Sequence, residues 1–119
     1  MRGDEKRVVS AFAEYLERAG WTVTFEQNFC DIVATRDGQE MWVEAKGRTA
    51  AVGLDVDTMY GQILRRMPPE PTEITAFAVV VPEAAKTSAL RIPRWVRQAL
   101  KIDVYVVSDT DSVEGPLDG

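Results

Sequence analysis

The chain has 119 residues, of which 45% are hydrophobic and 28% charged, a composition that suits one soluble globular domain. It contains no histidine and one cysteine, which excludes histidine-dependent triads, histidine-bound zinc and an internal disulfide framework. The net charge of −5 argues against a general nucleic-acid binder. Any catalysis must therefore use carboxylates, lysine, arginine, hydroxyl groups or a hard metal ion.

The first half of the chain predicts a helix followed by three strands. Apolar residues recur at helical spacing over residues 4–19, and residues 21–27 alternate as in a half-buried strand. Two further strands are predicted over 30–36 and 39–46. They are joined by Asp37-Gly38, a pair that tolerates the positive φ angles of a two-residue hairpin turn.

The second half alternates helices with strands. Residues 55–67 and 93–101 predict helices, and residues 75–81 and 103–107 predict strands, the first of them apolar throughout. The order is therefore α-β-β-β-α-β-α-β. It predicts a mixed α/β fold of the α+β type, with one mixed sheet and helices on its faces. The first three strands should form an antiparallel meander, and the last two should run parallel to a neighbour.

The predicted domain spans residues 1–107, and residues 108–119 are expected to form an acidic, flexible tail. This tail has four acids and no base, so the remaining body carries 14 basic and 15 acidic residues. Residues 1–6 do not resemble a signal peptide, and the apolar runs are too short to cross a bilayer. We therefore expect a cytoplasmic protein that does not interact with membranes.

The predicted hairpin brings two acids together. With Asp37-Gly38 as the turn, Asp31 lies directly opposite Glu44, with Cβ atoms about 4.5–5.5 Å apart. Lys46 leaves the same face of its strand, two residues beyond Glu44. Two opposed carboxylates repel each other and destabilise a sheet unless a cation lies between them.

This arrangement suggests a site for Mg²⁺ or Mn²⁺. Magnesium prefers one or two carboxylates together with water and phosphate oxygens, so Asp31 and Glu44 are candidate ligands, and the backbone carbonyl of Ala45 is a third. Lys46 is then placed to hold or deprotonate an attacking water, or to stabilise charge on a phosphodiester. The alternative is a pair of exposed acids for which Lys46 is a local salt-bridge partner.

The two segments resemble the motif of the PD-(D/E)xK, or restriction-endonuclease-like, nucleases. The match is Phe-Cys-Asp-Ile-Val-Ala over 29–34 and Trp-Val-Glu-Ala-Lys-Gly over 42–47, in a helix and strand context that covers about residues 4–107. The chain looks closest to the small domains near archaeal Holliday-junction resolvases and Mrr-like restriction enzymes. Cys30 replaces the proline often found before the acid, and we predict that Cys30 belongs to the core.

The resemblance implies that Asp31 and Glu44 bind the metal and that Lys46 is the catalytic lysine. It also implies an acid on the first helix, for which Glu5 is favoured, and a glutamine on the second helix, Gln62. The alternatives are a first-turn acid that complements the helix dipole and an exposed glutamine. Gly61, beside Gln62, costs helix stability, which suggests a close approach of this helix to the sheet.

Several basic residues are candidates for contact with DNA phosphates. Three of them are spaced three and four apart on the last helix and so share one stripe, although a solvated helix face is the simpler explanation. The candidates are Arg48, Arg65, Arg94, Arg97 and Lys101. Trp42 and Trp95 are predicted to be packing residues, not base-stacking platforms.

We therefore expect a metal-dependent nuclease that hydrolyses phosphodiester bonds in DNA. The alternative is a catalytically inactive domain of the same fold that binds nucleic acid or protein. The residues do not separate RNA from DNA as the substrate. A homodimer or a partner protein would suit the cutting of two strands.

Overall fold

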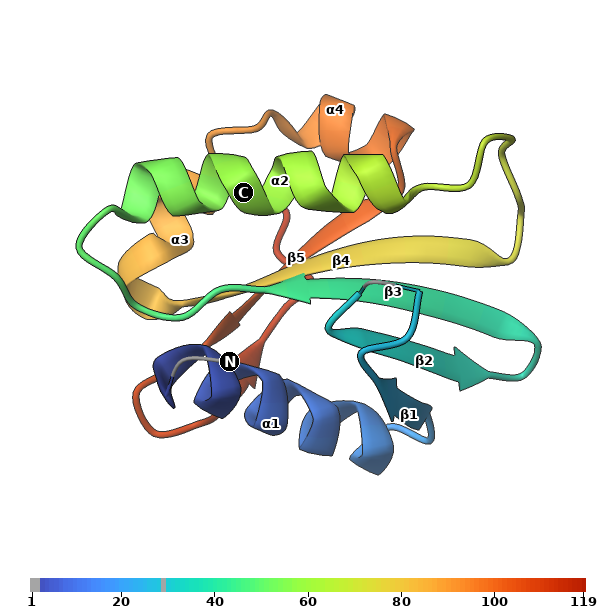
Figure 1. Ribbon diagram of the computed structural model, residues 1–119, viewed down its shortest axis with the longest axis horizontal. Helices are drawn as coiled ribbons and strands as arrows, with labels where there is room; N and C mark the ends of the chain where they lie inside the picture. The colour runs from blue at the N-terminus through green and yellow to red at the C-terminus, as the bar shows by residue number, and fades with distance from the viewer. Residues whose placement is uncertain (1–2, 29) are drawn as a thin grey trace.

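A six-stranded mixed sheet separates one long helix from the other helices (Figure 1). The computed structural model describes residues 3–28 and 30–119. Its elements, in chain order, are α1 (Gly3–Arg18), β1 (Thr22–Phe25), β2 (Ile32–Arg36), β3 (Gln39–Ala45), α2 (Val52–Arg66), β4 (Thr75–Pro82), a 3₁₀ turn η1 (Glu83–Ala85), α3 (Lys86–Ala89), α4 (Arg94–Ala99), β5 (Ile102–Val107) and β6 (Val113–Glu114).

The strands lie in sequence order across the sheet. Strands β1, β2 and β3 form an antiparallel meander, β4 and β5 continue the sheet in parallel with β3, and β6 returns antiparallel to β5. The prediction of a mixed α/β fold, with a meander followed by two parallel strands, is confirmed. Helix α2 starts three residues earlier than predicted, and α4 ends two residues earlier.

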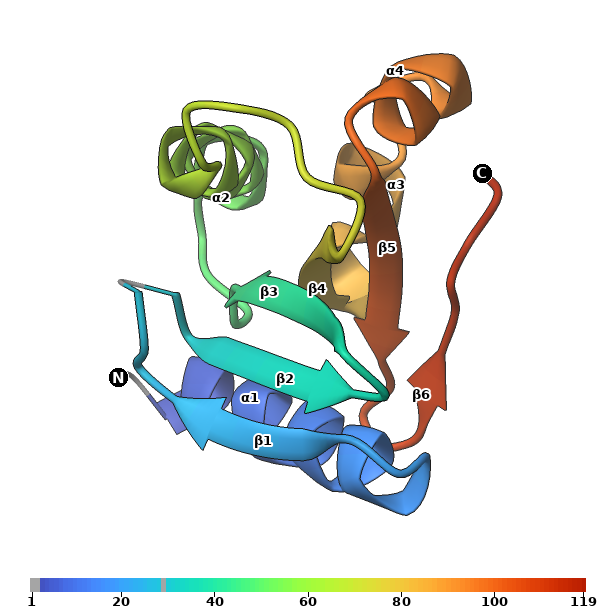
Figure 2. The same ribbon diagram turned by 90° about the vertical axis from the view of Figure 1, so that its right-hand side faces the viewer.

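Each face of the sheet buries its own apolar layer. Strand β4 shows this directly, because Ala78 and Val80 pack toward α1, whereas Phe77, Val79 and Val81 pack toward α2. Figure 2 shows α1 behind β1 and β2, with α2 on the opposite side above β3. The continuous apolar run predicted for this strand is thus explained by helices on both faces.

The hairpin between β2 and β3 has the predicted turn. Asp37 and Gly38 both have positive φ angles, of 53° and 80°, as a type I′ turn requires. Ile32 is paired with Val43, so the next pair outward in the same register is Asp31 and Glu44. The predicted register is confirmed for the paired residues, and Asp31 and Glu44 follow the last of these pairs.

The segment after Val107 is not the free tail that its composition predicted. Val113 and Glu114 form β6 against β5, and the N–H of Leu117 donates to the carbonyl of Val104 at 2.9 Å. Figure 2 shows the chain turning back beside β5 and running toward α4. A two-residue strand has too few positions to produce a recognisable alternation, so this element was missed.

Arg97 does not belong to the exposed stripe predicted on the last helix. Its side chain is buried, with the residue 3% exposed, and the guanidinium donates to the carbonyls of Ile92, Leu117 and Asp118 at 2.9–3.0 Å. Arg97 therefore holds the C-terminal segment against the domain and cannot contact DNA. The spacing was correct for one helix face, but that face is covered by the returning chain.

Replacing Arg97 with methionine is expected to lower the free energy of unfolding by about 2 kcal/mol, because three backbone carbonyls lose a charged donor. Hydrogen exchange should accelerate at β6 and at the N–H of Leu117. Arg94→Met is the matched control, since Arg94 is exposed and its contact with Asp118 is a surface ion pair of 3.6 Å. Equal exchange at β6 in both variants would contradict the anchoring role of Arg97.

Two further expectations concern exposure. A Cβ built on Gly61 meets nothing within 4 Å, so the predicted close approach of this glycine to the sheet is wrong. Trp42 packs edge-on against Phe77 as predicted, whereas Trp95 is 73% exposed and is not a packing residue. Within the described residues, no helix combines the length and hydrophobicity that a membrane span requires.

Candidate functional site

The two acids predicted from the hairpin come together at the end of β3. Asp31 immediately precedes β2, and its Oδ2 accepts a hydrogen bond of 2.8 Å from the N–H of Ala45. That N–H belongs to the residue next to Glu44, so the Asp31 carboxylate is held beside the Glu44 side chain. The antiparallel pairing ends at Ile32 and Val43, so Asp31 and Glu44 each lie one residue beyond the last pair, and the hydrogen bond to Ala45 fixes the direction of the Asp31 carboxylate.

Glu44 is a buried acid, only 4% exposed. Burial, and next the charge of Asp31, raise the pKa of Glu44 from its ordinary 4.5 to about 7, and the opposing effects of Arg66 and Lys46 do not offset them. The site therefore holds one carboxyl group that gives up its proton only near neutral pH. Perturbed acids of this kind cluster at functional sites.

Arg66, the last residue of α2, is the counter-ion of Glu44. Its Nε lies 2.9 Å from Glu44 Oε1. This oxygen is nevertheless buried without a hydrogen-bond partner in the described part of the chain, so the N–H of Arg66 does not point along the line between the two atoms. The two groups attract each other as charges but leave an acceptor position on Glu44 unfilled.

Lys46 and Glu5 meet beyond the end of β3. Lys46 Nζ lies 4.0 Å from Glu5 Oε1, although Lys46 directly follows β3 and Glu5 is in the first turn of α1. The N–H of Lys46 donates to the carbonyl of Val80 at 3.0 Å, which extends the pairing with β4 by one residue. Of the candidate acids on α1 and after β1, the structure thus brings Glu5 to Lys46, whereas Glu14, Glu17 and Glu26 are exposed.

Gly47 allows the close approach of α1. A Cβ atom built on Gly47 would lie 2.3 Å from the backbone nitrogen of Glu5 and 2.7 Å from the carbonyl carbon of Asp4. No other residue leaves room for this contact, because the neighbouring atoms are helix backbone. Glycine is therefore needed at position 47 because it lets the helix that carries Glu5 approach Lys46.

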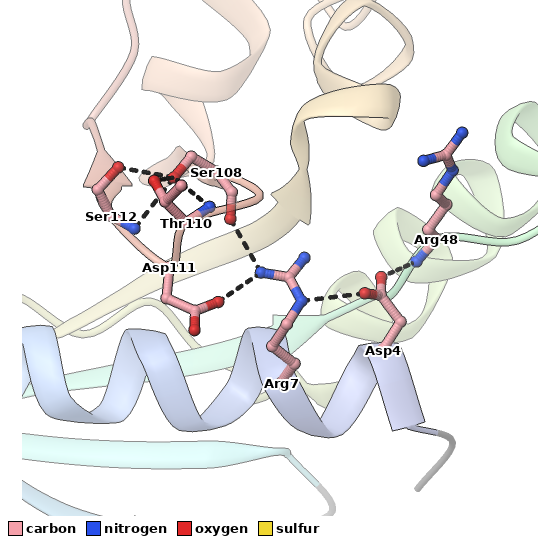
Figure 3. Close-up of polar contacts among 7 residues, drawn as sticks. All are labelled: Asp4, Arg7, Arg48, Ser108, Thr110, Asp111 and Ser112. Atoms are coloured by element: carbon pink, nitrogen blue, oxygen red, sulfur yellow. Dashed lines mark hydrogen bonds and ion pairs between the residues drawn. The ribbon is translucent and has the colours of Figure 1, made fainter.

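Asp4 holds the loop that follows β3 against α1 (Figure 3). Its carboxylate accepts a short hydrogen bond from the N–H of Arg48 and one of 3.0 Å from Arg7. The backbone hydrogen bond from Arg48 is the main reason that the pKa of Asp4 is lowered. Arg7 in turn donates to the carbonyl of Ser108 and to Asp111, at 2.9 and 2.6 Å, so the β5–β6 turn is tied to the same helix.

A cavity of about 210 Å³ lies between this loop and the start of α1. It is lined by residues of these two segments, namely Asp4, Glu5, Gly47, Arg48, Thr49 and Ala50. The cavity is therefore lined by Glu5 and by Gly47, the residue after Lys46, whereas Lys46 itself does not line it.

Gln62 lies one helical turn before Arg66, on α2. Its side-chain oxygen is buried without a hydrogen-bond partner in residues 3–28 and 30–119, and its backbone carbonyl accepts from Arg66 Nη1 at 3.0 Å. The predicted residue is thus next to the guanidinium that pairs with Glu44, and it has an unfilled acceptor. No contact of the Gln62 side chain with Glu44 is shown, so a direct role remains a prediction.

Cys30 is a buried residue, as predicted, and its pKa is raised to about 12, mainly by burial and next by the charge of Glu44. The thiol is therefore held in its neutral form and is not a nucleophile at ordinary pH.

The basic residues predicted to contact DNA are distributed over two regions. Arg48 and Arg65 are exposed on the loop and helix that border the site. Arg94 and Lys101 are exposed near α4, where Arg94 pairs with Asp118 and Lys101 donates to the carbonyl of Thr72. With Arg97 buried, the predicted stripe on the last helix does not form a continuous row.

The donor set fits a divalent cation that needs few protein ligands. The described residues hold no cluster of three or more Asp, Glu, Cys or His side chains that could bind a metal ion. Two carboxylates are present, one directed by Ala45 and the other with an unfilled buried oxygen. Mg²⁺ prefers a ligand set of one or two carboxylates together with water and substrate oxygens.

The counter-ion role of Arg66 was missed from the sequence. The signal present in the sequence is the four-residue spacing from Gln62, which puts both side chains on one face of α2. That the face turns toward Glu44 depends on how α2 crosses the sheet, and local sequence does not carry this information.

The chain shares its fold with two solved structures. No family model matches it, and no curated protein is similar in sequence. The structures are an XisH family protein from Nostoc punctiforme and an FdxN element excision controlling factor protein from Anabaena variabilis, with TM-scores of 0.55 and 0.54. Both are 18% identical to this chain, and each alignment covers 92% of it and 97% of the other protein. At this identity the similarity establishes a common fold alone.

Proposed function

We propose that this chain is a metal-dependent nuclease of the PD-(D/E)xK type that hydrolyses phosphodiester bonds in DNA. The observation that supports the proposal most strongly is the placement of two carboxylates, Asp31 and the buried Glu44, at the end of one hairpin. Lys46 follows at the spacing that the resemblance requires, and Glu5 lies 4.0 Å from its ammonium group. Buried like charges are costly, so their presence favours a functional origin.

Asp31 and Glu44 would hold Mg²⁺ or Mn²⁺, with the carbonyl of Ala45 as a further ligand. When bound, such an ion activates water and stabilises charge on a phosphoryl oxygen. Lys46 would hold the attacking water or stabilise the developing negative charge, and Glu5 would keep its ammonium group directed into the site. Gln62 would support a ligand or a phosphate from α2.

The exposed Arg48 and Arg65 border the site, and they would contact the DNA backbone. The net charge of −5 means that general electrostatic attraction is weak, so binding should depend on these local contacts. A second copy of the chain or a partner protein would supply the second cut in duplex DNA. A protein that acts on DNA in this way would work in the cytoplasm.

The second candidate is an inactive domain of the same fold that binds nucleic acid or protein. The ion pair of 2.9 Å between Arg66 and Glu44 favours it, because an arginine can neutralise the acid permanently in place of a metal ion. In that case Asp31, Glu44 and Lys46 would serve the fold and not catalysis.

The decisive measurement is cleavage of duplex, single-stranded and branched DNA, and of an RNA strand, with Mg²⁺ or Mn²⁺. We expect nicking that stops when the ion is chelated. Asp31→Asn and Lys46→Met should each lower the initial rate about 10²-fold, the loss typical for one group that stabilises a charged transition state. Asp57→Asn and Lys6→Met are the matched controls, since they remove the same charges from exposed positions on α2 and α1.

Unchanged cleavage in Asp31→Asn and Lys46→Met would show that the site is assigned wrongly. If the wild type neither binds a divalent ion in calorimetry nor cuts any of these substrates, the binding domain is the better description. Cleavage confined to the RNA strand would keep the site and change the substrate.

A further inference from the structure

We infer that Arg66 is an internal competitor of the metal ion: it pairs with Glu44 when no divalent cation is bound and releases Glu44 when one binds. The inference rests on the proposed function, because it concerns the same carboxylate. It goes beyond that function in assigning a residue that controls when the metal site forms.

The contact between the two groups is close but incomplete. Arg66 Nε is 2.9 Å from Glu44 Oε1, yet this oxygen accepts no hydrogen bond within the described residues. A charge-assisted hydrogen bond with good geometry would be roughly twice as strong as a neutral one, and this contact lacks that geometry. The pair therefore neutralises charge but leaves Glu44 Oε1 without a hydrogen bond. A ligand that also satisfies this oxygen should replace the guanidinium.

Lys46, the other cation beside Glu44, is already shared with Glu5, 4.0 Å away. An ionised carboxylate is costly to bury without a cation, so release of Arg66 from ionised Glu44 is coupled to arrival of another positive charge. A divalent ion satisfies this requirement, because it carries twice the charge and coordinates Asp31 at the same time. Arg66 and the ion therefore compete for one oxygen.

Arg66 lies at an edge of the fold, where a change of its side-chain position costs little packing. It is the last residue of α2, the next residue Met67 is extended, and the Arg66 side chain is 23% exposed. Its Nη1 donates to the carbonyl of Gln62 in its own helix, and this hydrogen bond would keep the guanidinium near the site after release. Arginine binds phosphate well, so a guanidinium held there would be available to a substrate phosphate.

Binding of the ion and binding of DNA should consequently favour each other. The ion frees the guanidinium for a phosphate, and a phosphate that holds the guanidinium frees Glu44 for the ion. Because such coupling is reciprocal, DNA should tighten Mg²⁺ binding by the same factor by which Mg²⁺ tightens DNA binding. Loss of Arg66 should remove the competition and the coupling together.

The test is calorimetric titration of Mg²⁺ into the wild type, Arg66→Met, Arg65→Met and Glu44→Gln, without DNA. We expect Arg66→Met to bind Mg²⁺ at least fivefold more tightly than the wild type. Arg65→Met removes the same charge from the neighbouring exposed position and should stay within twofold, and Glu44→Gln should abolish binding. Arg66→Gln repeats the test with a shorter polar side chain if the methionine variant does not fold.

A second readout does not depend on nuclease activity. The Nε–Hε signal of Arg66 in a nitrogen-15 spectrum should shift on Glu44→Gln, and it should shift in the same direction when Mg²⁺ is added to the wild type. A signal that ignores Glu44→Gln overturns the inference. Equal Mg²⁺ affinity in the wild type and Arg66→Met overturns it while the proposed metal site stands, and absence of Mg²⁺ binding in every variant overturns both.

Discussion

Replacing Gly47 with alanine is expected to lower the free energy of unfolding by about 3 kcal/mol, a large effect for the addition of one methyl group. The new Cβ would lie 2.3 Å from the nitrogen of Glu5 and 2.8 Å from its Cα. Helix backbone cannot rotate away as a flexible side chain can, so α1 and the loop after β3 must separate. The separation should also move Glu5 away from Lys46.

Gly61→Ala is the matched control for this prediction. Gly61 lies in the interior of α2, and an added Cβ meets no atom within 4 Å, so alanine should stabilise the protein by up to about 1 kcal/mol. Denaturant unfolding of both variants measures the two free energies directly. If both substitutions changed stability by similar amounts, Gly47 would not be the contact point between α1 and the loop.

Replacing Glu44 with glutamine is expected to flatten the pH dependence of stability when a chelator removes divalent ions. Burial and Asp31 raise the pKa of Glu44 from 4.5 to about 7. Between these values the folded protein keeps a proton on Glu44 that the unfolded chain has released, so the stability of the wild type falls as the pH rises. Above about pH 7 the loss is complete and amounts to roughly 3 kcal/mol at most.

Glutamine has no proton to release. The free energy of unfolding of the variant, relative to that of the wild type, should therefore rise by this amount between about pH 4 and pH 8. Thermal or denaturant unfolding across that range measures the difference. Glu14→Gln, which removes an exposed acid of α1, should follow the wild type within about 0.5 kcal/mol. A constant difference between Glu44→Gln and the wild type at every pH would contradict the buried, proton-holding state of Glu44.

The hairpin turn and register, which sequence predicted correctly, depend on local rules. Asp37-Gly38 selects one turn type, the turn determines the register, and the register places Asp31 opposite Glu44. Each step involves neighbours within one hairpin. The mixed sheet followed from the order of helical and strand patterns in the same way, since parallel strands need a crossover of the length seen here.

The features that sequence did not predict depend on packing between distant elements. Arg97 was expected on an exposed stripe because its helix spacing fits one, but the chain returns and covers it through Leu117 and Asp118. Arg66 reaches Glu44 only because α2 crosses the sheet at that point. The contact of Gly47 with α1 is similarly tertiary, and a glycine in a loop carries no sign of what lies against it.

The tight turn at Asp37-Gly38 also bears on how such a site can change in evolution. Ile32 and Ala34 are buried in the apolar layer against α1, so a slip of β2 by one position along β3 would turn both side chains away from that layer. A residue inserted into or deleted from the turn should therefore weaken the core and also direct Asp31 away from Glu44, so the length of this turn is constrained by stability as well as by the site.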